Sequence, residues 1–108
     1  MSSYRYMRTL LFFDLPTITA SERKAAAAFR KSLVKDGFLM LQESVYCKLS
    51  LNATAADNVR ERVKKYLPKE GSVIMLTITE KQFENMDLCL GKLSGTVMDS
   101  DSKLVVFC

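Results

Sequence analysis

Asp14 is the residue of this chain whose type and position point most directly to chemistry. It follows Phe12-Phe13 at the end of an apolar run and precedes Pro16, so its carboxylate is expected at the rim of a strand. A lone carboxylate holds a divalent cation poorly, because Mg²⁺ usually takes one or two carboxylates together with waters and phosphate oxygens. A nearby twofold axis would supply a second Asp14. A purely structural aspartate that starts the turn before proline remains the alternative.

Basic side chains form the second group of candidates. Lysine and arginine contact phosphates without recognising base sequence. The first set is Arg23, Lys24, Arg30, Lys31 and Lys35, and a second, similar set is Arg60, Arg62, Lys64 and Lys65. A solvated helix face is the alternative for both sets. Ser44 is a candidate phosphate contact or a structural hydroxyl, because a chain without histidine has no imidazole to activate it as a nucleophile.

Composition excludes several classes of protein. The absence of histidine removes Ser-His-Asp and Cys-His catalysis and histidine-ligated metals. The cysteines form no C-x-x-C pair, which argues against a zinc site. The net charge of +4 permits a polyanionic partner without requiring one. No apolar run approaches the roughly 18 residues of a membrane span, and no signal-peptide pattern occurs, so we expect a cytoplasmic protein without a membrane partner.

A strand and a helix must position the first candidates. Residues 4–13 become continuously apolar toward their end, as a central strand does. Thr19 and Glu22 match the T-x-x-E capping box, so a helix should begin there, and Gly37 should end it in the left-handed conformation. The expected buried stripe of this helix is Ala25, Phe29 and Leu33, widened by Ala26 and Val34.

The middle of the chain predicts a hairpin and a second helix. Residues 38–51 are too long for one strand, so a bend is expected near Gln42-Glu43. Thr54 to Asp57 is a second capping pattern, and Pro68 should stop the helix that follows. Its expected buried stripe is Ala56, Val59, Val63 and Tyr66 or Leu67.

The remaining segments complete a recognisable order of elements. Residues 73–78 predict a strand, 79–86 a short helical turn, and 103–107 a final short strand. The order β-α-β-β-α-β with an extra C-terminal strand is the α+β, ferredoxin-like pattern, in one domain spanning 1–108. Such an antiparallel sheet carries two helices on one face. Its other, apolar face needs a partner, which predicts a homodimer through the sheet face.

Four segments in register resemble the CRISPR-associated protein two family. They are residues 12–16 (FFDLP), 37–46 (GFLMLQESVY), 76–83 (LTITEKQF) and 100–107 (SDSKLVVF), the last similar to members from type II systems. Met40 departs from the pattern, since many members carry a basic residue there.

The resemblance implies a homodimer in which the two strand-end aspartates share Mg²⁺. In this chain that metal-ligating and catalytic residue is Asp14, and the activity would be phosphodiester hydrolysis of RNA or DNA. The resemblance also implies a spacer-acquisition role, in which the dimer bridges two dimers of the CRISPR integrase subunit and its basic helices contact duplex DNA phosphates. Three hypotheses follow: this adaptation subunit, a metal-dependent endoribonuclease, and a ligand-binding regulatory module of the same fold.

Overall fold

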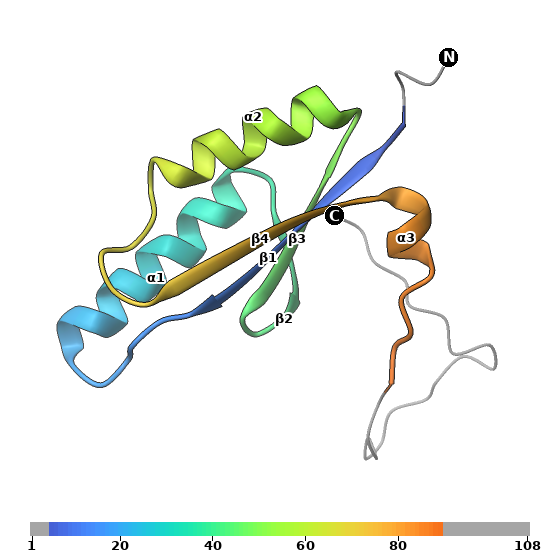
Figure 1. Cartoon of the computed structure of the whole chain (residues 1–108). Helices are drawn as coiled ribbons and strands as arrows, with labels where there is room; N and C mark the ends of the chain where they lie inside the picture. Colours follow the sequence, from blue (N-terminus) through green and yellow to red (C-terminus); the bar gives the residue numbers. More distant parts are fainter. Residues whose placement is uncertain (1–4, 90–108) are drawn as a thin grey trace.

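The computed structural model describes residues 5–89 of the chain, and the predicted strand at 103–107 and Tyr4, the first residue of the predicted first strand, lie outside this range. The elements are β1 (Met7–Asp14), α1 (Ala20–Lys35), β2 (Leu39–Gln42), β3 (Val45–Ser50), α2 (Ala53–Lys64), β4 (Ser72–Thr79) and α3 (Glu80–Glu84) (Figure 1). The predicted order β-α-β-β-α-β is therefore confirmed. So are the bend between β2 and β3 and the short helix after β4. No helix of the described part has the length and apolar character needed to cross a membrane.

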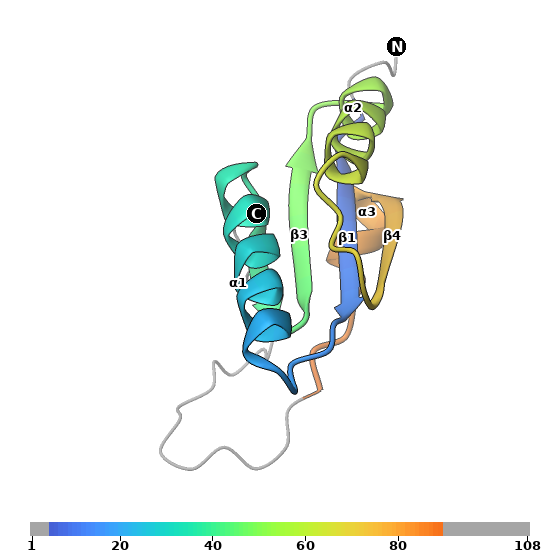
Figure 2. The ribbon, with the colours of Figure 1, turned by 90° about the vertical axis from the view of Figure 1, so that its left-hand side faces the viewer.

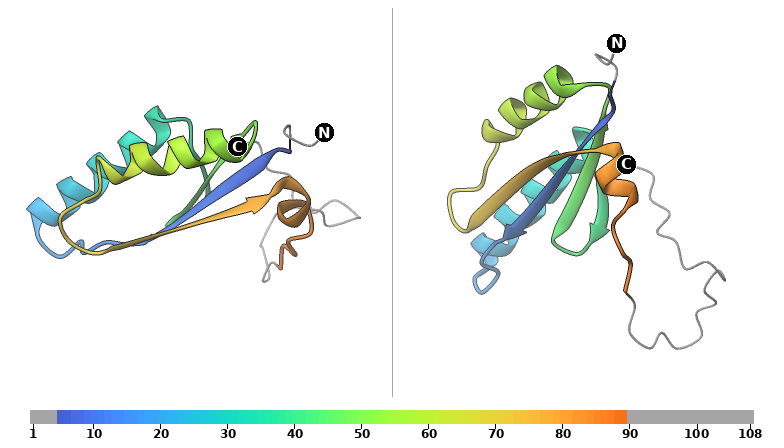
Figure 3. Two further views of the ribbon diagram at one scale, coloured as in Figure 1. Left: turned by 45° about the horizontal axis from the view of Figure 1, so that its top comes forward. Right: turned by 45° about the vertical axis from the view of Figure 1, so that its right-hand side comes forward.

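Strand β1 lies at the centre of the sheet. The strand order is β2-β3-β1-β4, and every neighbouring pair is antiparallel. Helices α1 and α2 lie on one side of these strands, as the two turned views show (Figures 2 and 3). This arrangement confirms the predicted α+β, ferredoxin-like fold.

The main core lies between the sheet and the two long helices. Alternate residues of β1, Leu11 and Phe13, are buried there because strand side chains point to opposite faces in turn. They pack with Phe29, Leu33, Phe38, Tyr46, Val59 and Val63. The stripe predicted for α1 is partly wrong. Ala26 is buried, whereas Ala25 is exposed and Val34 is 59% exposed. The spacing Ala26, Phe29, Leu33 follows the helical period more closely than a strict four-residue repeat.

The ends of the helices follow from capping chemistry. Thr19 and Glu22 form the predicted capping box of α1, and Gly37 has the predicted positive φ, 101°. The predicted cap of α2 at Thr54 is wrong. Asn52 is the N-cap, and its side chain accepts a hydrogen bond from the Ala55 amide at 2.8 Å. Asparagine caps at least as well as threonine, so the earlier of two competing cap residues starts the helix.

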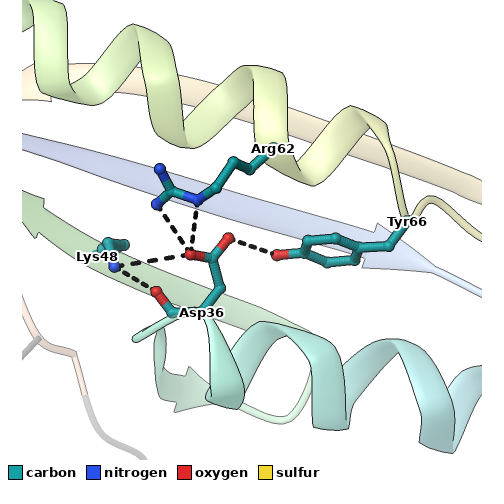
Figure 4. A network of polar contacts seen from close by, with 4 residues as sticks. All are labelled: Asp36, Lys48, Arg62 and Tyr66. Carbon is teal, nitrogen blue, oxygen red and sulfur yellow. Dashed lines mark hydrogen bonds and ion pairs between the residues drawn. The ribbon is translucent and has the colours of Figure 1, made fainter.

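Asp36, at the end of α1, joins both helices and the sheet (Figure 4). The Arg62 Nε and Nη2 atoms donate to Asp36 Oδ1 at 3.0 and 2.9 Å, and the Tyr66 hydroxyl donates to Oδ2 at 3.0 Å. Lys48 of β3 donates to the main-chain carbonyl of Asp36, and its Nζ lies 3.9 Å from Oδ1. Burial, together with the hydrogen bond to Asp36 and its charge, raises the pKa of Tyr66 far above its ordinary value, so its hydroxyl stays protonated. We call these four residues the Asp36 network.

We predict that Asp36→Ala lowers the free energy of unfolding by about 2–3 kcal/mol, because it leaves the Arg62 guanidinium and the Tyr66 hydroxyl without their acceptor and takes a nearby negative charge from Lys48. Chemical denaturation at one fixed protein concentration measures the change. Asp57→Ala is the matched control. Its carboxylate is exposed and 3.9 Å from Arg60, so the loss should be no more than about 0.5 kcal/mol. Equal losses in the two variants would show that the Asp36 network is not a stabilising element.

Candidate functional site

Asp14 is the last residue of β1 and pairs with Ser72 at the start of β4. Strand alternation places it with Leu10 and Phe12 on the face opposite to α1 and α2, which we call the open face. The carboxylate is exposed and makes no hydrogen bond or ion pair with any other described residue. Its oxygens are therefore available to a ligand.

Two turns hold the backbone at Asp14. Gly71, with φ of 91°, packs directly on it: a Cβ at this position would lie 2.6 Å from the Asp14 carbonyl oxygen and 2.8 Å from the Leu15 side chain. On the other side, the Phe13 amide donates to the Ser44 carbonyl at 3.1 Å. The predicted site residue Ser44 thus lies beside the end of β1. The sequence showed Gly71 only as a turn residue and gave no sign of this contact.

One chain alone offers a metal ion few ligands. Within residues 5–89 there is no group of three or more His, Cys, Asp or Glu side chains that could hold a metal. The available donor is the Asp14 carboxylate, a hard oxygen ligand of the kind that Mg²⁺ accepts alongside waters and phosphate oxygens. The residues therefore fit Mg²⁺ when a second Asp14 is brought close, and Mg²⁺ itself stays a prediction.

Large apolar side chains are exposed along the open face, from Ile74 near Asp14 to Leu49 opposite Arg8. Ile74 lies opposite Phe12 in the sheet, two residues from the Asp14–Ser72 pair, and is 62% exposed. Leu76, Leu39 and Leu49 are 49%, 44% and 37% exposed. Exposed apolar groups gathered on one face mark an interaction surface. The part of the sheet nearest Asp14 therefore has the character of an interface.

Helix α3 covers the other part of the open face, and Arg8 anchors it. The Arg8 side chain is almost fully buried, and its Nε and Nη2 donate to the two Glu80 carboxylate oxygens at 2.5 and 2.8 Å. Its guanidinium also lies 4.4 Å from the centre of the Phe83 ring. The hydrogen bond from Arg8 lowers the pKa of Glu80 below its ordinary value. Sequence patterns did not indicate this pair, whose members are 72 positions apart.

The basic residues predicted on α1 fall into two groups. Lys24, Lys31 and Lys35 are exposed and form no ion pair with any described residue. Arg23 instead donates to the carbonyls of the loop before α1, and Arg30 lies 5.3 Å from the Phe13 ring centre. All five belong to the helix layer, whereas the Asp14 side chain belongs to the open face. Of the predicted phosphate contacts, the structure therefore brings Ser44 but not the basic residues of α1 to the Asp14 end of the sheet within one protomer.

The basic residues of α2 are mostly paired. Arg62 bonds to Asp36, Lys64 to Glu61 at 3.0 Å, and Arg60 lies 3.9 Å from Asp57. Lys65 is exposed and has no such partner among the described residues. The similar basic face expected on α2 is thus much weaker than its sequence indicated.

Comparisons with known proteins agree with this architecture. The family model described as CRISPR associated protein Cas2 matches residues 7–86. A protein of Treponema denticola is 45% identical over 100 residues, covering 93% of this chain and 99% of its own length. A protein of Streptococcus mutans (strain UA159) is 48% identical over 99 residues, covering 92% and 91%. Both are named CRISPR-associated endoribonuclease Cas2.

A solved structure described as a crystal structure of cas2 shares the fold. It superposes with a TM-score of 0.56 at 20% identity and covers 87% of this chain and 97% of its own. This likeness supports the arrangement of helices and strands alone.

We predict that Gly71→Ala destabilises the protein by about 3 kcal/mol, because a positive φ is unfavourable with a Cβ and the new Cβ meets main-chain atoms of Asp14 and Leu15. Gly37→Ala is the control. Its Cβ would meet only the end of the flexible Lys48 side chain, so the loss should be about 1 kcal/mol. Thermal unfolding of both variants measures the difference. A Gly71→Ala protein as stable as Gly37→Ala would contradict close packing at Asp14.

We predict that the Arg8–Glu80 pair weakens in acid. A carboxyl whose pKa is lowered by folding stabilises the protein above the ordinary pKa of about 4.5, and this contribution is lost as pH falls through the lower folded value. The difference in unfolding free energy between wild type and Glu80→Gln should therefore shrink below about pH 4.5. Glu84→Gln, an exposed change on the same helix, is the control. If the difference in unfolding free energy between wild type and Glu80→Gln stays constant with pH, the ionised Arg8–Glu80 pair does not stabilise the fold.

Proposed function

Because the chain belongs to the Cas2 family of CRISPR-associated proteins, we propose that it is a nuclease that works as a homodimer with Asp14 at its reacting centre. The observation that carries this proposal is the exposed carboxylate of Asp14, which has no partner among residues 5–89 and lies near exposed apolar side chains such as Ile74. Relatives named endoribonucleases favour RNA as the substrate.

The homodimer is proposed from the open face. Burying Ile74 and Leu76 against a second copy removes apolar surface from water, at about 25 cal/mol for each Å². A twofold axis through this part of the face would bring the two Asp14 side chains toward each other, because Asp14 borders the same apolar patch. The site would then be complete only in the dimer.

The residues of this chain would divide the chemistry as follows. Mg²⁺ bound by the two carboxylates would stabilise negative charge on the phosphate and lower the pKa of water. Asp14 would hold the cation at a fixed point, because Gly71 and the β2–β3 turn fix the end of β1. Ser44, half-buried in that turn, is the proposed hydroxyl contact to a neighbouring phosphate. The chain has no histidine, so no imidazole would act as a base at this site.

A second proposed role is that of a spacer-acquisition subunit. The supporting observation is the exposed set Lys24, Lys31 and Lys35 on α1. A dimer formed through the open face leaves the helix layers outward, where these lysines would contact duplex phosphates without base specificity. In this role the homodimer bridges two dimers of the CRISPR integrase subunit. Cleavage at Asp14 is not required for it.

We predict that Asp14→Asn abolishes Mg²⁺-dependent cleavage of single-stranded RNA while the fold and the dimer remain, because a neutral amide is a weak ligand for a divalent cation. Cleavage is measured with Mg²⁺ and with chelator, and circular dichroism and sedimentation check the fold and the dimer. Asp57→Asn, an exposed change on α2, is the control and should cleave as wild type does. Wild-type cleavage by Asp14→Asn would refute Asp14 as the metal ligand. Duplex DNA binding without cleavage in every variant would leave the spacer-acquisition role.

A further inference from the structure

A basic cleft lies between the last turns of α1 and α2. It has a volume of about 420 Å³ and is lined by Ser32, Lys35, Asp36, Arg62, Lys65 and Tyr66. It lies in the helix layer, on the side of the sheet away from the Asp14 carboxylate. Figure 4 shows how Arg62 and Tyr66 reach from α2 and its end toward Asp36 on α1. The cleft lies beside these contacts between the two helices.

Positive charge dominates the lining of the cleft. Lys35, Arg62 and Lys65 face one carboxylate, that of Asp36. Asp36 is itself occupied, since one oxygen accepts from Arg62 and the other from the Tyr66 hydroxyl. Lys48 of β3 lies close to the same carboxylate. The three cationic side chains of the lining therefore outnumber its one carboxylate, and an anion that enters the cleft meets a net positive surface.

The cationic groups differ in how firmly they are held. The Arg62 guanidinium is fixed by two hydrogen bonds to Asp36 Oδ1, which use Nε and Nη2 and leave Nη1 without an acceptor among the described residues. A guanidinium held in place loses less freedom when it binds an anion. The two lysines at the mouth, Lys35 and Lys65, are exposed and have no ion-pair partner among residues 5–89. The Ser32 hydroxyl adds one neutral donor to the lining.

We infer that this cleft binds a phosphate group of a nucleic-acid strand that crosses the helix layer from α1 to α2. The bonded guanidinium, the two exposed ammonium groups and the hydroxyl are donors of the kind that phosphate oxygens accept from. The inference rests on the proposed function, because it takes nucleic acid as the partner. It goes beyond that function by assigning one phosphate to a defined cleft, in which Lys35 of α1 acts together with Arg62 and Lys65 at the end of α2.

The neighbouring residue Lys64 makes the inference testable. Lys64 is exposed and lies one position from Lys65, but it pairs with Glu61 at 3.0 Å and does not line the cleft. The test variant is Lys35→Gln/Lys65→Gln, and the control is Lys64→Gln/Lys81→Gln, which removes the same charge elsewhere. Both are made in the Asp14→Asn protein, so that cleavage does not disturb binding. The probe is a short blunt DNA duplex, with affinity measured over a series of salt concentrations.

Removing one phosphate contact reduces the slope of log K against log salt by about 0.9 on duplex DNA. We expect the slope of the cleft variant to fall by about this amount, and the control variant to keep the parental slope. Equal slopes for the two variants would overturn the inference, even if Asp14-dependent cleavage stands. Weaker binding of inorganic pyrophosphate by the cleft variant, without any change in the duplex slope, would also overturn it, because the cleft would then serve a free anion. If the slope of the cleft variant falls and the wild-type protein does not cleave RNA, the result would support phosphate binding in the cleft and refute only the proposed nuclease activity.

Discussion

The alternation of side chains along β1 is the constraint on which the other features depend. Leu11 and Phe13 fill the core beneath the helices. Because successive residues of a strand point to opposite faces, Asp14 must then lie on the open face. A slip of one residue in register would exchange the two sets and bury the carboxylate under α1. The apolar core thus determines on which face the Asp14 carboxylate lies.

This constraint gives the protein two chemically different faces. The open face carries the exposed carboxylate of Asp14 near apolar side chains such as Ile74, with α3 covering another part of it. The helix layer carries the exposed lysines and the cleft beside the Asp36 network. The sheet lies between them, so an open-face dimer and a nucleic acid on the helices do not compete for surface. One small domain can therefore serve a dimeric site and a phosphate-binding surface at once.

The fold was predictable because its determinants are local. The Thr19–Glu22 capping box, the positive φ of Gly37 and the period-two strands act within a few residues, and each appears in the structure where the sequence placed it. Competition between local patterns was harder to judge, and Asn52 rather than Thr54 caps α2. The site was less predictable. Asp14 was proposed from sequence, but the packing of Gly71 against it joins distant segments that no local pattern connects.

Ion pairs explain why the charge pattern of the sequence was only a partial guide. A net charge of +4 over the chain is modest and says nothing about where the excess lies. Asp57, Glu61 and Asp36 engage three basic residues of α2, and these contacts appear only when the helix is folded and packed. On the helix layer, Lys24, Lys31 and Lys35 of α1 and Lys65 after α2 keep charges that no described ion pair offsets. A small excess that is concentrated in this way produces a stronger local field than the same excess spread evenly over the surface.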